Sequence, residues 1–323
     1  MNHSMSTPTI RDIQSTAQQI RANVGKVIVG KDAVVDLALV ALLCEGHILF
    51  EDVPGIGKTT LAKALARSLG CSFRRIQCTP DLLPSDVTGL AVFNQKTQEF
   101  EYRAGPVMAQ ILLADEINRA TPRTQSALLE AMQERQITVD GATKMLPRPF
   151  LVLATQNPIE LEGTFPLPEA QIDRFFMRLR LGYPTDEEEN AILLRFERDD
   201  PLDNLQAVVD ADAILAMQHI VRTVRVESSV RDYVIAVVRA TRAHTSVQLG
   251  ASPRGSLYLY HAAQAFAALH GREFVLPDDV KYLTPFVLTH RLIISAQTRL
   301  RGRDAEQIVK EVVEAVPVPV EQA

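Results

Sequence analysis

A short apolar run leads directly into a glycine-rich loop and then into an amphipathic helix over residues 47–70. Gly55 and Gly57 let the backbone curl so that consecutive amides point inward at a polyphosphate. Lys58 adds a positive charge beside the terminal phosphates, Thr59 offers a hydroxyl to Mg²⁺, and the positive end of the helix faces the same anion. The segment therefore predicts a phosphate-binding loop for a nucleoside triphosphate. Its residues are Pro54, Gly55, Ile56, Gly57, Lys58, Thr59 and Thr60.

One position departs from the usual phosphate-loop pattern. The pattern has a glycine five residues before Gly57, and this chain has Asp52 there. That glycine eases the turn out of the strand but does not form the phosphate cradle. The alternative interpretation is a plain Gly-Pro turn that joins a strand to a helix. The complete strand, loop and helix context favours the phosphate-binding loop.

A second apolar run, 111–115, ends in two carboxylates, Asp115 and Glu116. Asp115 at the strand end can hold Mg²⁺ through its water shell, because Mg²⁺ prefers oxygen ligands and keeps several waters. Glu116 can accept the proton of an attacking water as a general base. A solvated acidic strand end is the alternative, and the nearby phosphate loop argues against it.

Three further polar residues complete a candidate hydrolytic site. Asn157 follows the buried run 151–155 and can position water against a γ-phosphate, although an asparagine also commonly opens a turn before proline. Arg174 precedes an apolar pair and can complete a neighbouring subunit's site; a surface salt bridge is the alternative. Arg254 lies in the first turn of an expected helix, where positive charge opposes the helix dipole and indicates a compensating anion such as the nucleotide phosphates.

Composition excludes several classes of protein. The 323 residues suffice for two ordinary domains, and 46% hydrophobic with 23% charged residues is typical of a globular chain. A net charge of -5 disfavours sequence-independent nucleic-acid binding, and no segment is apolar enough to span a bilayer. Cys44, Cys71 and Cys78 form no CxxC pair and are expected to be reduced thiols of a cytoplasmic protein.

The order of elements predicts an α/β domain followed by an all-α domain. Apolar runs alternating with helical patterns indicate a parallel sheet. Expected strands are 47–51, 72–77, 111–115, 151–155 and 177–181. Expected domains are a polar tail at 1–19, the α/β domain at 20–183 with hairpin inserts near 87–103 and 136–148, a helical domain at 184–315 and a tail at 316–323. Expected helices of the second domain are 187–196, 210–221, 229–244, 253–270, 277–288 and 305–315.

The order of these features along the chain resembles that of an AAA+ ATPase: the phosphate loop, the acidic strand end, Asn157, Arg174 and Arg254. The local sequence motifs resemble those of the MoxR family most. The resemblance covers about residues 20–310. It is carried by 51–55 (EDVPG), 79–86 (TPDLLPSD), 114–120 (ADEINRA), 128–132 (LLEAM) and 167–175 (LPEAQIDRF). Many members of that family also carry an aspartate at the position of Asp52.

The resemblance implies a P-loop parallel-sheet domain with a helical lid, and ATP and Mg²⁺ as ligands. It implies that Val29 and Gly30 lie against adenine, that Arg174 reaches the nucleotide of a neighbouring subunit, and that the active form is a homo-oligomeric ring, a hexamer. Family members act as chaperone-like remodellers that mature partner proteins, in some cases by inserting a metal cofactor. They commonly pair with proteins that bear a von Willebrand A domain.

Three rival functions stay open from the sequence. A magnesium-chelatase-like motor subunit shares the fold and inserts. A nucleic-acid motor of the helicase-loader kind would need basic and aromatic surfaces, whereas aromatic residues are 6% and the hairpin 136–146 holds only Lys144 as a basic residue. A nucleotide-gated assembly module that scarcely hydrolyses ATP is the third, and Glu116, Asn157 and Arg174 argue against it.

Overall fold

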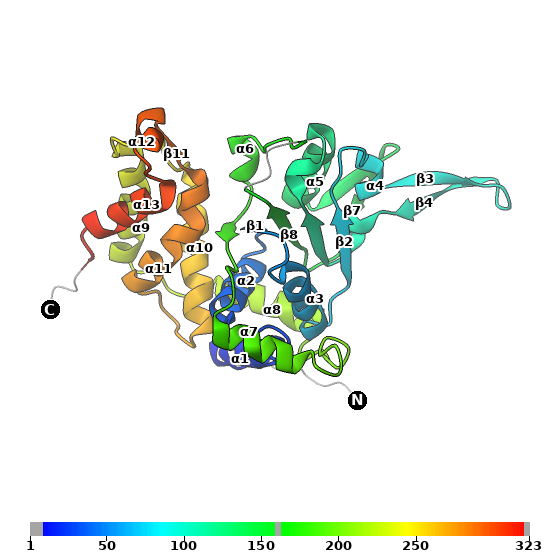
Figure 1. The fold of residues 1–323 in the computed structure, drawn as a ribbon, viewed down its shortest axis with the longest axis horizontal. Helices are drawn as coiled ribbons and strands as arrows, with labels where there is room; N and C mark the ends of the chain where they lie inside the picture. The colour runs from blue at the N-terminus through cyan, green and yellow to red at the C-terminus, as the bar shows by residue number, and fades with distance from the viewer. Residues whose placement is uncertain (1–8, 159–162, 320–323) are drawn as a thin grey trace.

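A five-stranded parallel sheet forms the centre of the computed structural model, which describes residues 9–158 and 163–319 (Figure 1). The strand order is β2-β5-β8-β1-β9, and each neighbouring pair is parallel. The strands are β1 (Ile48–Glu51), β2 (Phe73–Gln77), β5 (Ile111–Asp115), β8 (Leu151–Gln156) and β9 (Met177–Leu179). The α/β fold predicted from the alternating pattern is confirmed.

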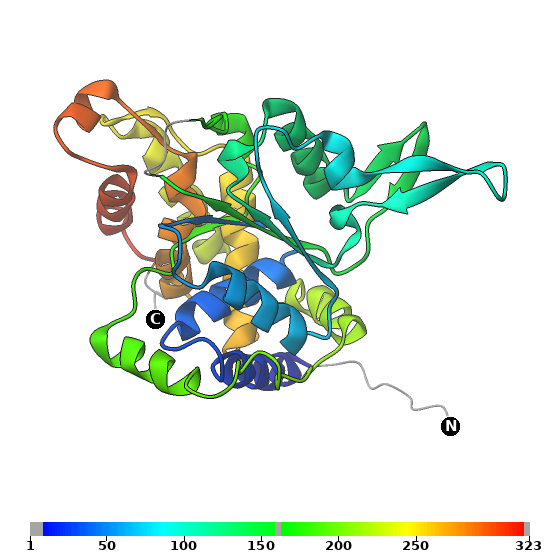
Figure 2. The same ribbon diagram turned by 45° about the vertical axis from the view of Figure 1, so that its right-hand side comes forward.

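Two separate layers of apolar side chains cover the two faces of this sheet. Successive residues of a strand point to opposite faces, so Leu112 and Leu113 of β5 belong to different clusters. On one face Leu112 packs with the helix α5 (Pro122–Glu134). On the other, Leu113 belongs to a larger cluster that includes helices beneath the sheet (Figure 2). These helices are α1 (Ile10–Val24), α2 (Asp32–Leu43), α3 (Lys58–Ser68) and α8 (Ala211–Val221). The helix α7 (Asp186–Arg195), which has no buried residue, lies beside α1 in Figure 1.

The remaining helices form the lid, which lies beside the sheet domain in Figure 1. Proline at the first helical position marks the start of α10 and α11, where its missing N–H costs nothing. The lid helices are α9 (Ser228–Ala243), α10 (Pro253–Leu269), α11 (Pro277–Leu288), α12 (Ala296–Leu300) and α13 (Ala305–Ala315), with the short strands β10 (Val247–Leu249) and β11 (Ile293–Ile294).

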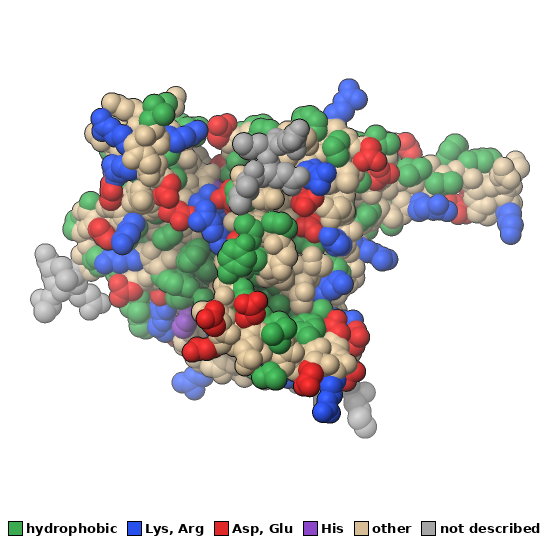
Figure 3. Space-filling view, in the orientation of Figure 1, with side chains coloured by type: hydrophobic (Ala, Val, Ile, Leu, Met, Phe, Trp, Pro, Cys, Tyr) green, Lys and Arg blue, Asp and Glu red, His purple; other side chains and the backbone are tan. Residues whose placement is uncertain are grey.

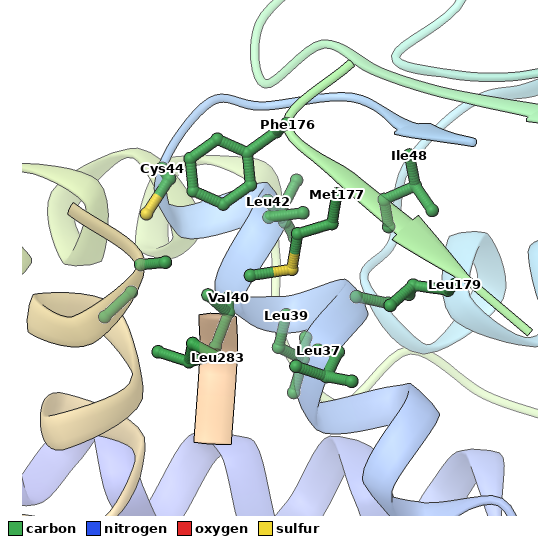
Figure 4. Packing of buried hydrophobic residues seen from close by; sticks show 14 of the residues in the cluster. Leu37, Leu39, Val40, Leu42, Cys44, Ile48, Phe176, Met177, Leu179 and Leu283 are labelled. Carbon is green, nitrogen blue, oxygen red and sulfur yellow. The ribbon is translucent and has the colours of Figure 1, made fainter. Parts of the chain in front are cut away.

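Lid and sheet domain share one hydrophobic core. Helix α2 is almost wholly apolar, and eight of its residues are buried. Figure 4 shows Val40 of α2 near Leu283 of α11, with Met177 of β9 close by. The continuous core fixes the position of the lid relative to the sheet.

Two antiparallel hairpins interrupt the alternation of strands and helices. They are β3 (Gly89–Asn94) with β4 (Glu99–Ala104), and β6 (Gln136–Val139) with β7 (Ala142–Met145). Asp140 and Gly141 both have positive φ, as expected at a two-residue hairpin turn. The first hairpin projects furthest from the molecule (Figure 1). The Lys144 ammonium lies 4.5 Å from the ring centre of Tyr102, so the two hairpins contact each other.

The helix α1 occupies residues 10–24, where the sequence interpretation had a polar tail to residue 19. Thr9 and Asp12 form a reciprocal capping box, which fixes the start of the helix. Ile13, Ala17 and Ile20 recur every three to four residues and are buried, whereas the polar residues between them face outward. Because most residues of this segment are polar, the apolar residues at helical spacing were not recognised from the sequence.

Several short elements link the main ones, and the lid begins later than expected. They are α4 (Pro84–Thr88), α6 (Glu169–Ile172) and the 3-10 turns Pro106–Met108, Ile117–Arg119 and Thr289–Arg291. The helices α7 and α8 were expected in the lid but lie beneath the sheet, where α8 contacts α2. Residues 316–319 follow the last helix, and the rest of the predicted C-terminal tail lies outside the described residues. No helix of the described chain is long and apolar enough to cross a membrane.

Candidate functional site

The phosphate loop joins the carboxyl end of β1 to the amino end of α3. Gly55 (φ 85°) and Gly57 (φ 93°) adopt left-handed backbone conformations that other residues rarely take. A side chain at either position would meet nothing within 4 Å, so the surface above both glycines is open to a ligand. Gly57 immediately precedes α3, and the first backbone amides of that helix face the loop.

Lys58 is held at the base of the loop by backbone carbonyls. Its Nζ donates to the oxygens of Asp52 and Val53 at 2.9 and 3.0 Å. Burial lowers the pKa of Lys58, while the negative charges of Asp52, Asp115 and Glu116 act in the opposite direction. The ammonium therefore lies within the field of the same carboxylates that the sequence analysis assigned to catalysis and metal binding.

Thr155 joins Asp115 to Glu116. Its hydroxyl donates to Asp115 Oδ1 at 2.6 Å and accepts from the backbone N–H of Glu116 at 2.8 Å. Glu116 has φ 58°, a left-handed conformation that is uncommon for a residue with a side chain. Such strain persists where the surroundings enforce it, frequently at functional sites. The hydrogen bond from Glu116 N–H to Thr155 stabilises this conformation.

Residues of the edge strand β2 contact both carboxylates. Arg75 donates to Asp115 Oδ2 from Nη2 at 2.7 Å and from Nε at 3.1 Å. Gln77 Nε2 and Arg119 Nη1 donate to Glu116 Oε2 at 2.8 and 3.2 Å. From the sequence alone no role is predicted for Arg75 or Thr155, and it stays open whether Gln77 or Arg119 couples ligand sensing to catalysis. The available signals were polar residues two apart on β2 and a threonine at the end of an otherwise apolar strand.

Two cavities flank the phosphate loop. One, of about 380 Å³, is polar and is lined by the loop and by Arg75, Gln77, Asp115, Glu116, Thr155 and Asn157. The other, of about 440 Å³, is bordered by Val29, Ile192 and Phe196 on the far side of the loop. The polar lining of the first cavity suits phosphates and a metal ion, and the apolar lining of the second suits a nucleotide base. Their arrangement around one loop fits a nucleotide.

The segment expected against adenine lies only partly in that position. Val29 and Lys31 line the apolar cavity, but Gly30 does not. Gly30 has φ 69° and faces Glu188, whose carboxylate would collide with any side chain placed there. Lys31 reaches the same carboxylate at 3.3 Å. Gly30 therefore supports the turn that positions Val29.

Asp52 explains why the usual glycine can be absent. Its carboxylate accepts backbone N–H bonds from Leu181 at 2.5 Å and Gly182 at 3.1 Å, and the residue is buried. These bonds fasten the start of the phosphate loop to the segment that leaves β9 and borders the apolar cavity. Asp52 thus contributes to the structure around the loop and does not face the phosphate cradle.

Arg174 and Arg254 lie together at the opposite edge of the sheet. Both line a cavity of about 230 Å³ that also includes His47 and Phe176, which directly precede β1 and β9. Amino ends of parallel strands share one edge, and the phosphate loop is at the other. The structure therefore does not bring these two arginines to the phosphate loop of their own chain. Within the described chain the Arg174 guanidinium makes no ion pair or hydrogen bond.

A buried arginine of the lid supports this arginine pair. Arg291, with 1% of its side chain exposed, places Nε 3.0 Å from Asp173 Oδ1 and donates to the carbonyl oxygens of Asp173 and Phe175. Arg254 Nη1 lies 3.8 Å from Asp173 Oδ2. Burial lowers the pKa of Arg291 to about 10, and the Asp173 carboxylate opposes that change. Asp173, which directly precedes Arg174, is thus tied to the lid through Arg291 and Arg254.

The oxygen donors at the carboxyl edge fit Mg²⁺. Thr59 and Asp115 both line the polar cavity and offer a hydroxyl and a carboxylate. Mg²⁺ is commonly held by one or two carboxylates together with substrate phosphates and waters, rather than by a full protein cage. No group of three His, Cys, Asp or Glu residues that could hold a metal occurs among residues 9–158 and 163–319.

Comparisons with known proteins agree with this geometry. Residues 47–177 match the family "ATPase family associated with various cellular activities (AAA)", and residues 239–312 match the AAA lid domain. The chain is similar to YeaC of Bacillus subtilis (53% identity over 93% of this chain and 94% of the relative) and to Chaperone MoxR1 of Mycobacterium tuberculosis (42% identity over 94% and 82%). A crystal structure of a candidate ATPase from Cytophaga hutchinsonii superposes with a TM-score of 0.90 at 38% identity, covering 96% of this chain and 97% of that one.

The parallel sheet, the phosphate loop with its acidic strand end, and the helical lid define an AAA+ ATPase domain. Similarity to MoxR1 extends over nearly the whole chain rather than over the nucleotide-binding domain alone. The chain belongs to the MoxR family of AAA+ ATPases.

Proposed function

We propose that this protein hydrolyses ATP with Mg²⁺ at a site shared between two subunits of a hexameric ring, and uses the reaction to remodel a partner protein. The observation that carries the proposal is the division of one catalytic set between two edges of the sheet. Lys58, Glu116 and Asn157 border the phosphate cavity, whereas Arg174 and Arg254 line the cavity at the other edge. A second copy of the chain can unite the two halves.

At the carboxyl edge we assign the following roles. Lys58 and the loop amides would bind the phosphates. Thr59 and Asp115 would hold Mg²⁺, which would neutralise part of the negative charge of the phosphates. Glu116 takes a proton from water as the water oxygen bonds to the γ-phosphorus, and the bond to the β,γ-bridging oxygen breaks to leave ADP and phosphate. Asn157 orients that water.

At the amino edge, Arg174 and Arg254 are proposed to contact the γ-phosphate of a neighbouring subunit. Guanidinium groups suit this task because their planar forks match phosphate oxygens and stay charged. Arg174 is the stronger candidate because no carboxylate within the described chain neutralises it. Arg222 and Arg135 line the same cavity, and Arg135 is paired there with Glu45.

The two hairpins are proposed to transmit movement to the partner protein. Phe100 is 74% exposed and stacks edge-to-face with Phe93 at 5.4 Å on the first hairpin. Figure 3 shows hydrophobic side chains along this projecting arm. Exposed aromatic residues on a projecting arm commonly serve contacts with other proteins. We propose a protein with a von Willebrand A domain and a client as partners, with the metal requirement of the client open.

The ATPase rate per subunit, measured against protein concentration with light scattering on the same samples, tests the shared site. We expect the specific rate to rise as a larger species forms. Arg174→Ala is expected to assemble and bind ATP but to lose about 10³-fold or more in rate. Arg148→Ala, which removes a charge paired with Glu45 at the same edge, is the control and should leave the rate unchanged.

Mixing two inactive variants gives a sharper test. In a ring of Arg174→Ala and Glu116→Gln subunits, some interfaces combine the intact Glu116 of one subunit with the intact Arg174 of the next. Random mixing leaves about a quarter of the interfaces intact, so activity should reappear on mixing. If the mixture stays inactive although mixed rings form, the site is not shared, and the ring proposal is overturned.

A further inference from the structure

The edge strand β2 places an arginine on the proposed metal-binding carboxylate. Gln77 is directly opposite Asp115 in the parallel register, and Arg75 lies two residues earlier on the same face of the strand. The Arg75 side chain runs along the strand, and its Nη2 and Nε both donate to Asp115 Oδ2, at 2.7 and 3.1 Å. This contact joins the edge of the sheet to the centre of the proposed hydrolytic site.

Both oxygens of Asp115 are thereby engaged by donors of the protein. Oδ2 accepts two N–H bonds from Arg75, and Oδ1 accepts the Thr155 hydroxyl at 2.6 Å. A carboxylate offers about two acceptor positions on each oxygen, so Oδ2 is saturated. The waters around Mg²⁺ need the same acceptor positions, and the metal carries the same sign of charge as the guanidinium. Arg75 and Mg²⁺ therefore cannot both use Asp115 Oδ2 fully.

Arg75 is free to move away from Asp115 without disturbing the core. Its side chain is 46% exposed, and it lines the polar cavity together with Lys58 and Thr59. Phosphate oxygens bound in that cavity would offer its fork an acceptor equivalent to a carboxylate. The neighbouring Arg74 lies on the opposite face of the strand and does not line the cavity.

The same arginine is linked to the proposed catalytic base. Arg75 Nη2 donates to Gln77 Oε1 at 2.6 Å, and Gln77 Nε2 donates to Glu116 Oε2 at 2.8 Å. Departure of Arg75 from Asp115 thus also releases the amide of Gln77. Binding of Mg²⁺ at Asp115 is therefore connected to the contacts of Glu116 through two hydrogen bonds, one from Arg75 to Gln77 and one from Gln77 to Glu116.

We propose that Arg75 is a positioning residue that competes with Mg²⁺ for Asp115, so that the Arg75–Asp115 ion pair sets the Mg²⁺ concentration at which the protein takes up Mg²⁺–nucleotide. The proposal rests on the proposed ATPase function and adds a residue to its metal site. In this arrangement the site binds Mg²⁺–nucleotide only when Mg²⁺ displaces the Arg75 guanidinium from Asp115.

The test is binding of a fluorescent, non-hydrolysable ATP analogue over a range of free Mg²⁺. Arg75→Ala is expected to lower the half-saturating Mg²⁺ concentration about two- to fivefold, the range that a half-exposed ion pair allows. Affinity in EDTA and the thermal midpoint without metal should not increase. Arg74→Ala removes the same charge from the same strand and should match the native protein.

The outcomes separate this inference from the proposed function. If the native protein binds the analogue with normal Mg²⁺ dependence, but Arg75→Ala has an equal or higher Mg²⁺ requirement, competition is overturned while the ATPase proposal stands. The proposed function itself would be overturned by either of two results: the native protein binds no nucleotide, or the Lys58→Ala variant binds nucleotide as tightly as the native protein. In an Asp115→Asn background, Arg75→Ala should no longer change the Mg²⁺ requirement; a change of the same size would also overturn the inference.

Discussion

The two edges of the central sheet differ in how completely their polar residues are satisfied within one chain. At the carboxyl edge, Asp115 and Glu116 each accept hydrogen bonds from neighbouring strands or turns. At the amino edge, Arg174 makes no ion pair within the described chain, and Arg254 approaches a carboxylate only at 3.8 Å. The first edge is organised by its own chain, whereas at the second edge the Arg174 guanidinium has no paired anion within the described residues. This difference supports the proposal that another subunit completes the amino edge.

The largest effect should come from the carboxyl edge. Lys58→Ala removes the ammonium that faces the phosphates, and we expect affinity for ATP to fall about 100-fold or more because the nucleotide charge loses its partner. Calorimetric titration with Mg²⁺–ATP measures this. Lys63→Ala, an exposed residue of the same helix, is the control. Equal affinity of Lys58→Ala and native protein would refute the loop assignment.

Glu116→Gln should separate binding from hydrolysis at the same edge. The amide retains the shape of the side chain but cannot take the proton of water, so we expect the rate of ATP hydrolysis to fall about 10²- to 10⁴-fold. Affinity for ATP should stay within a factor of about three. Phosphate release at saturating ATP provides the measurement, with Glu130→Gln on the exposed side of α5 as control. Normal turnover would place the base on another residue.

From the sequence, residue types suggested a chemical role for each edge of the sheet. Nothing in the sequence indicated that the two groups of residues lie at opposite edges. Periodicity predicted the five strands that the structure contains, and residue types at their carboxyl ends predicted roles for Asp115, Glu116 and Asn157, which the structure places around one polar cavity. These features are local, because strand and loop preferences depend on neighbours in sequence. On the basis of helix-dipole charge, Arg254 was expected to face an anion such as the nucleotide phosphates; in the structure it lies at the edge of the sheet opposite the phosphate loop of its own chain.

That separation depends on tertiary packing that no local pattern contains. The lid is positioned by a core shared between α2, β9 and α11, whose members are far apart in sequence. Thr155 and Arg75 were not predicted, and the role of Gln77 stayed open, for a similar reason: their contacts follow from the parallel register that sets β2 beside β5 and β5 beside β8. Neither the register nor the strand order can be derived from apolar runs alone.

Acid should weaken the amino edge through His47. This buried histidine accepts the Val152 N–H at Nδ1 and donates from Nε2 to the Met132 carbonyl, each at 3.0 Å. Burial lowers the pKa of His47 to about 4, below its ordinary 6.5. Between these values the unfolded chain binds more protons than the native protein, so stability falls as pH drops from 6.5 towards 4, by about 3 kcal/mol over the full range.

Urea unfolding at several pH values measures this contribution. His47→Gln should be less stable than the native protein at pH 7, and the difference should shrink as the pH is lowered, because the variant has no imidazole to protonate at this site. His290, whose pKa is also lowered by burial, remains in both proteins and cancels in the comparison. His219→Gln, on the exposed side of α8, is the control. A difference independent of pH would show that His47 does not carry the acid sensitivity.

The smallest effect should come from the ion pair that holds the lid against the residue before Arg174. Asp173→Asn keeps the side-chain shape but leaves the buried Arg291 without its carboxylate, although the carbonyls of residues 173 and 175 remain. We expect the free energy of unfolding to fall by about 2 kcal/mol, less than for a fully isolated pair because those carbonyls persist. Asp203→Asn, from the exposed pair with Arg67, should change it by less than about 0.5 kcal/mol. In the monomer, ATP affinity should be unchanged in both variants, because the phosphate loop of the same chain lies at the other edge. If Asp173→Asn instead weakened ATP binding in a monomer, the two edges would be coupled within one chain, and their independence would have to be abandoned.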